Sequence, residues 1–333
     1  MSSPSPKPLT IWCNAKFSDD VARQLGEGVG ALGHRLVFSA FSSASVLDAG
    51  KPDPALDDAD IALGQPDVAQ CMSLPALRWI EVTTAGYTRY DREDFQDAIR
   101  ARAGAFTNAS QVFAEPCAQH VLAMMLAFAR QLLPSHRDQL TDQSWHYSER
   151  RYDSRLLNGE TVFMLGYGTI ARRLTELLAP FGMRIVAVRR RAISEPGVHI
   201  IPEDRVSAAL AGADHIVNLL SDNETTRNYV NARRLSCCKP GAKFYNIGRG
   251  TTVDHRALVE ALESGRLAAA YLDVFETEPL PPADPLWTAR NCYITPHTAG
   301  GRRDQDAAIV RHFLENLAAW TRQKGGGMID RIV

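Results

Sequence analysis

Residues 161–190 read TVFMLGYGTIARRLTELLAPFGMRIVAVRR, and this stretch decides the fold of the larger part of the chain. Its first five residues form a continuous apolar run, which is typical of a buried strand. Helical spacing of apolar residues follows over Thr169–Phe181, and Arg184–Val188 has the pattern of a second strand. A strand, a helix and a strand in this order predict a βαβ unit with parallel strands.

Strand and helix patterns alternate on both sides of this unit, so we predict an α/β fold with two parallel sheets. A long apolar run over Ser110–Leu133 predicts a helix that crosses between domains, and the polar, aromatic stretch Pro134–Arg155 predicts a surface arm. A further amphipathic helix is predicted over Asp304–Trp320. The other predicted strands are Leu9–Cys13, Arg35–Phe38, Ala59–Leu63, Trp79–Val82, His215–Leu220, Lys243–Ile247 and Ala268–Leu272, and the other helices are Asp19–Leu32, Asn231–Cys237 and His255–Ser264.

Length and charge exclude several classes of partner. A chain of 333 residues with 45% hydrophobic residues has apolar material for two cores. Its net charge of −1 creates no global field that would attract nucleic acid or an anionic membrane. The N-terminus lacks the apolar core of a signal peptide, and the apolar run Val121–Ala129 is too short to span a membrane. We therefore expect a cytoplasmic protein without nucleic-acid or membrane partners.

The six cysteines are scattered, without C-x-x-C pairs or histidines at zinc spacing. Reduced, mostly buried thiols are the favoured interpretation, and we expect no metal site.

The turn Gly166-Tyr-Gly168-Thr169-Ile170-Ala171 follows a strand and opens a helix, which is the context that a dinucleotide-binding G-x-G-x-x-A motif requires. The first glycine permits the tight turn, the second lets a pyrophosphate approach the backbone, and the helix N-terminus faces the phosphates. A purely structural glycine turn is the alternative.

The end of the following strand informs on the cofactor. NAD-binding versions place an acidic residue there for the ribose 2′-hydroxyl, whereas this chain has Arg189-Arg190-Arg191. A guanidinium can bind a 2′-phosphate that a carboxylate would repel, so the arginines favour NADP. A solvated basic loop with NAD still bound is the other interpretation.

Charged groups follow three later strands, at the sheet edge where α/β domains bind ligands. Reduction of a 2-oxo acid needs a cation for the carboxylate and carbonyl and a proton donor for the developing alkoxide. Arg249 and His297 fit these needs, and Glu278 can stabilise the imidazolium of His297. Taken singly, each has an ordinary explanation as a surface or loop residue.

Together these residues resemble the D-isomer-specific 2-hydroxyacid dehydrogenase family. The family signature has the form RG-x-x-V-D…AL-x-x-AL-x-x-G…DVF-x-x-EPL, and residues 249–281 read RGTTVDHRALVEALESGRLAAAYLDVFETEPLP. The likeness extends over essentially the whole chain.

The resemblance implies two flavodoxin/Rossmann-like domains, with residues 109–299 as an NAD(P)-binding domain inserted into a substrate domain made of residues 1–108 and 300–333. The active site would lie in the cleft between them. Similar proteins are homodimers joined through the region that matches Ala109–Arg155, with an arm at about 134–155.

The resemblance also implies roles for single residues. Arg249 would bind the substrate carboxylate and carbonyl, His297 would be the acid/base, and Glu278 would hold and tune it. Backbone amides of Ala85, Gly86 and Tyr87 would receive the carboxylate, and Asp273 would contact the nicotinamide carboxamide. The expected cofactor contacts are Gly166, Gly168, Thr169, Ile170, Arg189, Arg190, Leu220, Ser221, Thr226, Ile247, Gly248, Arg249, Asp273, His297 and Gly300.

The chain departs from the family pattern at three places. Arg189 replaces the usual aspartate, and Ser221 replaces a common proline, which affects the adenine side. Tyr87 stands in the substrate loop, where we expect it to crowd the pocket and restrict substrate size.

Other functions on the same fold stay open. Formate dehydrogenases pair the histidine with glutamine, so Glu278 argues against them, whereas a phosphite-oxidising enzyme would keep all three groups. A cofactor-sensing corepressor-like protein is disfavoured by the short termini. A pseudoenzyme is disfavoured by the intact Arg249, Glu278 and His297. The favoured function is an NAD(P)-dependent 2-oxo acid reductase, with glyoxylate and hydroxypyruvate as first candidates.

Overall fold

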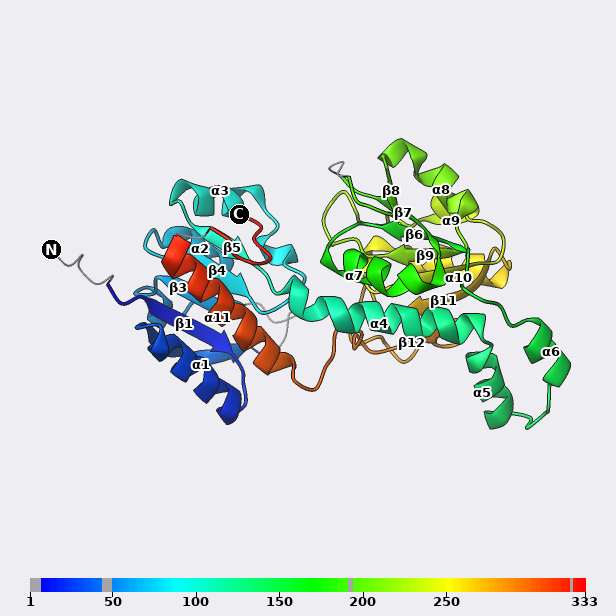
Figure 1. The fold of residues 1–333 in the computed structure, drawn as a ribbon, viewed down its shortest axis with the longest axis horizontal. Helices are drawn as coiled ribbons and strands as arrows, with labels where there is room; N and C mark the ends of the chain where they lie inside the picture. The colour runs from blue at the N-terminus through cyan, green and yellow to red at the C-terminus, as the bar shows by residue number, and fades with distance from the viewer. Residues whose placement is uncertain (1–6, 44–49, 191–193, 324–325) are drawn as a thin grey trace. The chain divides into compact units, whose positions relative to one another are not determined.

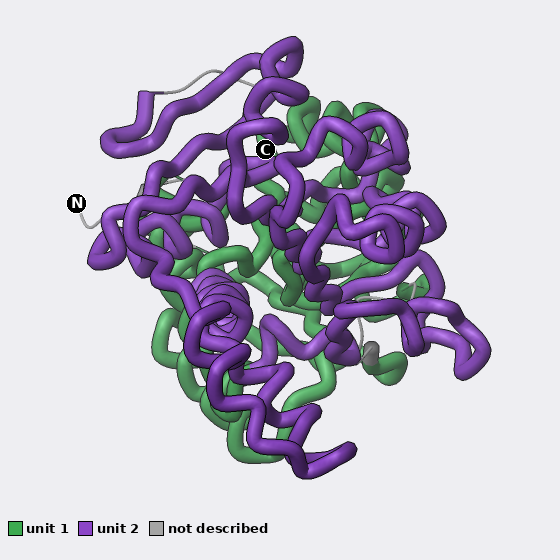
Figure 2. The backbone as a smooth tube through the Cα atoms, turned by 90° about the vertical axis from the view of Figure 1, so that its right-hand side faces the viewer, with its two compact units in different colours: residues 1–113, 302–333 green, residues 114–301 purple. Residues whose placement is uncertain are grey.

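The computed structural model describes residues 7–43, 50–190, 194–323 and 326–333. The chain divides into two compact units, which are shown in different colours in Figure 2. Unit 1 comprises residues 1–113 and 302–333, and unit 2 comprises residues 114–301. The second unit is therefore an insertion into the first.

Unit 1 is built on a parallel five-stranded sheet (Figure 1). The strands lie in the order β2 (Arg35–Ser43), β1 (Thr10–Ala15), β3 (Ile61–Gly64), β4 (Trp79–Val82) and β5 (Ala105–Thr107). β3 and β4 are buried along their whole length, which explains their mostly apolar sequences, and Glu81 is the one charged residue in these two strands.

Helices cover both faces of this sheet. α1 (Asp19–Ala31) and α11 (Gln305–Gln323) share one apolar cluster with β1, β3 and β4. α2 (Val68–Ser73) and α3 (Glu93–Ala101) contribute to the cluster on the other face. Because α11 comes from the end of the chain, unit 1 needs both termini to complete its core.

Unit 2 contains a parallel seven-stranded sheet. Its order is β12 (Cys292–Ile294), β11 (Leu267–Leu272), β10 (Ala242–Asn246), β9 (His215–Asn218), β6 (Thr161–Leu165), β7 (Arg184–Val188) and β8 (Val198–Ile201). The chain runs from β6 outward to β7 and β8 and then returns to β9 on the other side of β6. The junction of β6 and β9 is thus a topological switch point, where open α/β sheets bind ligands.

Three helices, α8 (Val206–Gly212), α9 (Ala232–Ser236) and α10 (His255–Glu263), share an apolar cluster with these strands. α4 (Ser110–Ala129) packs on a row of aromatic rings: Tyr245, Tyr271 and Tyr293 are neighbours across β10, β11 and β12. Phe128 contacts the first and last of these rings, and His120 stacks on Tyr271 at 5.4 Å. The row explains why a long apolar helix is held at this position.

α4 is long and apolar enough to cross a membrane by length and composition, but half of the relevant window is buried. One such helix is weak evidence for a span, since the core helix of a soluble domain has the same properties. The cytoplasmic location stays a prediction.

The segment after α4 differs from the sequence prediction. The predicted helix over Ser110–Leu133 ends at Ala129 because Gln131 has φ +58, a left-handed conformation that stops the helix. The arm then contains two short helices, α5 (Leu132–Leu140) and α6 (Tyr147–Tyr152). Most of their large apolar side chains are exposed, and Trp145 between the two helices is 91% exposed.

The predicted fold class is confirmed: two parallel-sheet α/β units, one inserted into the other. α7 (Thr169–Leu178) follows β6 as the βαβ unit requires. Short 3₁₀ turns complete the chain at Pro54–Leu56, Thr88–Tyr90, Ala179–Phe181, Glu203–Arg205, Gly250–Thr252 and Pro285–Trp287.

Candidate active site

The glycine turn after β6 has the geometry of a phosphate-binding turn. Gly166 has φ +91, which favours glycine, and its amide donates to the Val188 carbonyl at 3.1 Å. Gly168 caps α7, and a methyl group placed on it would meet no atom within 4 Å. The first-turn amides of α7, from Thr169 and Ile170 onward, are therefore approachable by an anionic group, as a dinucleotide pyrophosphate requires.

The basic residues after β7 lie next to the glycine turn. Leu165 and Val188 are register partners, so Arg189 lies beside the glycine turn. Arg189 is half-buried and Arg190 is exposed, and neither pairs with a carboxylate in the described parts of the chain. The nearby Glu195 pairs with Arg172 instead, at 3.2 Å. Two guanidinium groups that pair with no carboxylate in the described residues are suited to binding a 2′-phosphate. Arg191, which was also predicted to favour NADP, lies outside the described residues.

The loops after β9 and β10 touch each other. A methyl group on Gly248 would lie 2.7 Å from the Leu220 carbonyl oxygen, so the close approach requires glycine. Ser221 is exposed at the start of a turn that the Thr226 hydroxyl closes by donating to the Ser221 carbonyl at 2.6 Å. Ile247 is buried beside Gly248. These predicted cofactor residues thus line one continuous edge with the glycine turn.

Arg249 is held by three buried polar residues that the sequence analysis did not single out. The Arg249 carbonyl accepts hydrogen bonds from the Asn246 amide at 3.2 Å and from the Thr252 hydroxyl at 2.6 Å. Asn218 donates to both Asn246 and Thr252, at 3.0 and 2.7 Å. All three side chains are fully buried, so they fix the backbone from which Arg249 projects.

The Arg249 guanidinium is a partly buried cation. One of its nitrogens donates to the Gly248 carbonyl at 2.6 Å, and no carboxylate pairs with it among the residues described. Burial lowers its pKa, while the charges of Glu278 and Asp222 oppose that effect, and a guanidinium remains protonated at neutral pH. Four of its five N–H donors can therefore serve an anionic ligand.

His297 and Glu278 form the predicted pair. His297 Nδ1 lies 2.7 Å from Glu278 Oε2, and Glu278 Oε1 accepts from the Phe275 amide at 2.8 Å. Burial raises the pKa of Glu278, but the His297 and Phe275 hydrogen bonds and the Arg249 charge outweigh it and lower the pKa below its usual value. The carboxylate is thus ionised at neutral pH. Because Glu278 occupies Nδ1, His297 keeps Nε2 for a ligand, and its side chain is 36% exposed.

Asp273 organises the loop that carries His297. Its buried carboxylate accepts from the Thr295 hydroxyl at 2.5 Å and from the Thr298 and Ala299 amides at 2.8 and 2.9 Å. The His297 amide donates to the Asp273 carbonyl at 2.9 Å. These bonds hold His297 at φ +54, an uncommon conformation for this residue. Gly300 follows at the end of the same loop, and contact of Asp273 or Gly300 with a nicotinamide stays a prediction.

The predicted substrate loop lies in unit 1, at the carboxyl end of β4. The amides of Ala85 and Gly86 donate to no acceptor in the described chain, so they can receive a carboxylate. Tyr87 packs its ring edge-on against Phe106 at 5.8 Å, within the core of unit 1. The expectation that the Tyr87 ring restricts substrate size stays a prediction.

The structure thus places Gly166, Arg189, Arg249, Glu278 and His297 in unit 2, after the carboxyl ends of its strands. Asn218, Asn246, Thr252 and Thr295 are the residues that sequence reasoning missed. A buried asparagine that ends a strand, as at Asn218 and Asn246, was the available signal.

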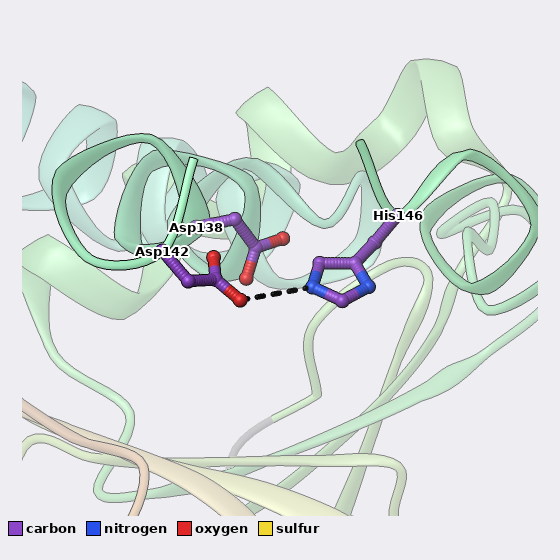
Figure 3. Close-up of side chains that lie close together, drawn as sticks. All are labelled: Asp138, Asp142 and His146. Atoms are coloured by element: carbon purple, nitrogen blue, oxygen red, sulfur yellow. Dashed lines mark ion pairs between the residues drawn. The ribbon is translucent and has the colours of Figure 1, made fainter. Parts of the chain in front are cut away.

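One further group of potential metal ligands lies on the arm (Figure 3). The ligand atoms of Asp138, Asp142 and His146 lie within 4.8 Å of one another. Arg150 already binds both oxygens of Asp138, at 2.7 and 2.9 Å. The positive charge of Arg150 opposes a cation there, so this group carries no metal assignment.

Comparison with known proteins gives a consistent result. Residues 122–299 match the family described as "D-isomer specific 2-hydroxyacid dehydrogenase, NAD binding domain". A glyoxylate reductase of Aeropyrum pernix is 32% identical over 256 residues, which cover 75% of each chain.

Two solved structures cover nearly all of the chain. A D-isomer specific 2-hydroxyacid dehydrogenase from Xanthobacter autotrophicus Py2, in complex with NADPH and MES, has a TM-score of 0.80 and 27% identity and covers 98% of both chains. An NADPH-dependent glyoxylate/hydroxypyruvate reductase from Sinorhizobium meliloti, in complex with NADP and malonate, has a TM-score of 0.71 and 25% identity and covers 98% of this chain and 97% of that one.

Proposed function

Because this chain belongs to the D-isomer-specific 2-hydroxyacid dehydrogenase family, we propose that it reduces a small 2-oxo acid, such as glyoxylate or hydroxypyruvate, with NADPH as the preferred reductant. As a family member it is an NAD(P)-dependent dehydrogenase that acts on CH–OH groups. One observation carries the proposal: Arg249, which is partly buried and forms no ion pair within the described residues, follows β10, and the ion-paired His297 follows β12 of the same sheet.

Each residue has a defined part in the reaction. Arg249 binds the substrate carboxylate and polarises the carbonyl, since a guanidinium recognises oxyanions bidentately. When bound, a reduced nicotinamide would supply the hydride for C2 of the substrate. As the carbonyl π bond breaks, the oxygen takes a proton from His297 Nε2 and becomes a hydroxyl. Glu278 keeps the imidazolium oriented before this transfer and holds the neutral ring after it.

The preference for NADPH rests on Arg189 and Arg190. Both residues follow β7, and their guanidinium groups have no carboxylate partners in the described structure. A negatively charged 2′-phosphate could therefore form ion pairs with them. The two similar solved structures described above are complexes with NADPH and NADP. We infer the same preference for this chain.

A small substrate is supported by the names of the relatives. The similar archaeal protein is a glyoxylate reductase, and the similar protein of Sinorhizobium meliloti is a glyoxylate/hydroxypyruvate reductase. We assign unit 2 to the cofactor, as residues 109–299 were predicted to be, and unit 1 with Ala85, Gly86 and Tyr87 to the substrate.

A homodimer joined through the arm is the proposed assembly. Six large apolar side chains of residues 132–156 are more than half exposed: Leu132, Leu140, Trp145, Tyr147, Tyr152 and Leu156. Such a concentration of exposed apolar surface is typical of an interface. Sedimentation of the wild type and of a Trp145→Ala, Leu140→Ala variant tests this: the wild type should sediment as a dimer and the variant as a monomer.

Cofactor oxidation followed at 340 nm tests the proposed reaction, using a panel of 2-oxo acids with NADPH and NADH. We expect faster oxidation of NADPH with glyoxylate or hydroxypyruvate, and its loss in His297→Ala. Tight NADPH binding without turnover of any acid would contradict the proposal and favour a cofactor-sensing role, whereas turnover of phosphite alone would identify the other catalytic alternative.

A further inference from the structure

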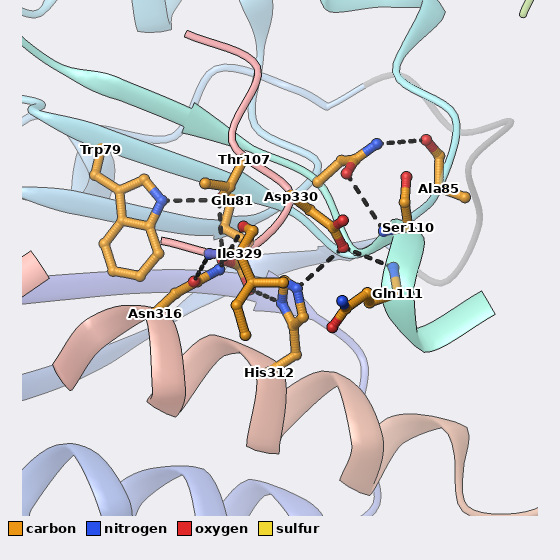
Figure 4. Close-up of polar contacts among 11 residues, drawn as sticks. Trp79, Glu81, Ala85, Thr107, Ser110, Gln111, His312, Asn316, Ile329 and Asp330 are labelled. Atoms are coloured by element: carbon orange, nitrogen blue, oxygen red, sulfur yellow. Dashed lines mark hydrogen bonds and ion pairs between the residues drawn. The ribbon is translucent and has the colours of Figure 1, made fainter. Parts of the chain in front are cut away.

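A buried polar cluster lies in unit 1 and includes residues to which we assign no contact with the substrate (Figure 4). Glu81 on β4 is fully buried, and the side chains of His312 on α11 and Asp330 in the C-terminal tail are 5% and 7% exposed. Removing such charges from water is costly, and apolar replacements of buried ion pairs are often at least as stable. Stability alone therefore explains the cluster poorly.

His312 links two carboxylates. Its Nδ1 lies 3.1 Å from Glu81 Oε1, and its Nε2 lies 3.2 Å from Asp330 Oδ2. Because an ionised carboxylate only accepts hydrogen bonds, both ring nitrogens must donate, and His312 is an imidazolium. Glu81 is further fixed by Asn316 at 2.7 Å and by Thr107 at 2.9 Å. The cluster thus clamps α11 and the C-terminal tail to β4.

Asp330 is hydrogen-bonded to the first turn of α4. Its Oδ2 also accepts from the Gln111 amide at 2.6 Å, in the first turn of α4, and its carbonyl accepts from the Asn108 amide at 3.2 Å. Asp330 has φ +55, so the tail turns sharply to make both contacts. One carboxylate oxygen is therefore shared between His312 and the helix that continues into unit 2.

Asn108 is hydrogen-bonded to the predicted substrate loop. Its side-chain amide donates to the Ala85 carbonyl at 2.7 Å, and the next residue, Ala109, donates its backbone amide to the Thr84 carbonyl at 3.0 Å. The peptide whose carbonyl Asn108 holds is the one that contains the Gly86 amide, a donor left unused in the described chain. The orientation of that donor therefore depends on Asn108, which in turn is bound by Asp330.

We propose that His312 and Asp330 are positioning residues for the substrate-carboxylate loop Thr84–Tyr87, acting through Asn108. This inference rests on the proposed function, because the value of the loop lies in its binding of a 2-oxo acid. Neither residue touches the substrate. Their role is to fix the direction of the Ala85 and Gly86 amides, so their loss should weaken acid binding more than it slows hydride transfer.

The test compares His312→Gln with the matched control His215→Gln. His215 is also fully buried and also bound to a glutamate, with its Nε2 2.7 Å from Glu160. It lies at the amino end of β9, however, whereas Arg249 follows the carboxyl end of the parallel strand β10. Hydrogen–deuterium exchange of full-length protein reports on residues 84–90, and glyoxylate kinetics with NADPH report KM and kcat separately. Asp330→Ala and Asp330→Asn form a second pair, since asparagine retains an acceptor for the Gln111 amide.

We expect His312→Gln to speed exchange in residues 84–90 and to raise KM for glyoxylate about tenfold, with kcat changed by less than about threefold. His215→Gln should do neither, and Asp330→Asn should recover part of what Asp330→Ala loses. Unchanged exchange and unchanged KM in His312→Gln would overturn the proposal, as would an equal effect of His215→Gln. If the wild type reduces no acid, the proposed function fails, and the exchange experiment alone decides whether His312 positions the loop.

Discussion

The protonation of His312 should make the stability of unit 1 depend on pH. Burial lowers the pKa of His312, but the hydrogen bonds to Asp330 and Glu81 outweigh it and raise the pKa to about 9 from an unfolded value of 6.5. A group with a raised folded pKa stabilises the protein fully below pH 6.5, and this contribution is lost as pH rises through 9. Since one pKa unit corresponds to about 1.4 kcal/mol, the contribution is about 3 kcal/mol.

Urea unfolding of the wild type and His312→Gln at several pH values measures this contribution. The buried tryptophans Trp12 and Trp79 belong to unit 1, whereas Trp145 and Trp287 are exposed, so tryptophan fluorescence reports mainly on unit 1. The free energy of unfolding of the wild type exceeds that of the variant by an amount that should shrink by about 3 kcal/mol between pH 6.5 and about pH 10. The titration of groups that both proteins share cancels in this difference. A difference that is constant over this range would refute the assignment of a protonated His312.

The control His215→Gln should behave oppositely. Burial lowers the pKa of His215 more than its hydrogen bond to Glu160 raises it. The stability that this residue contributes is then present above pH 6.5 and lost as pH falls below that value. Its difference from the wild type should be flat in the alkaline range.

The remaining predictions concern the site in unit 2. His297→Ala should abolish turnover and leave the NADPH dissociation constant, measured by fluorescence titration, unchanged; normal turnover would remove His297 from the mechanism. Glu278→Gln should lower kcat about tenfold or more, since a neutral amide stabilises the imidazolium less than a carboxylate does; an unchanged kcat would show that Glu278 does not support His297. Arg189→Asp should lower the kcat/KM ratio of NADPH to NADH by about tenfold or more, and an unchanged ratio would mean that Arg189 is only solvated. Arg249→Lys should reduce kcat/KM for the acid by about 100-fold, because a lysine cannot bind a carboxylate bidentately; retention of activity would argue against that contact.

Strands with continuous apolar runs were predictable from the sequence. Thr161–Leu165, Arg184–Val188 and Trp79–Val82 begin and end where predicted, because most of their side chains are buried and apolar. Short or edge elements were missed. β8 includes a polar histidine, and most of its side chains are only partly buried. β5 and β12 have only three residues each, which is too few for a hydrophobic period to be recognised.

The site was predictable where chemistry depends on residue type and strand ends. The pairing of His297 with Glu278 was predicted as a hypothesis, and the two side chains are hydrogen-bonded in the structure. The supporting residues were not predictable, because Asn218 meets Asn246 and Thr252 only when two separate segments of the chain fold together. The same is true of His312 and Asp330, whose connection to Ala85 spans both ends of the chain.

The central claim is that Arg249, Glu278 and His297 serve hydride transfer to C2 of a 2-oxo acid. Its most direct test is the reduction of hydroxypyruvate with NADPH that carries deuterium on either face of the nicotinamide C4, with the product separated on a chiral column and analysed by mass spectrometry. Our account predicts the D-hydroxy acid, with one deuterium at C2 from one labelled face only. An L product, or a D product without deuterium from either face, would contradict it.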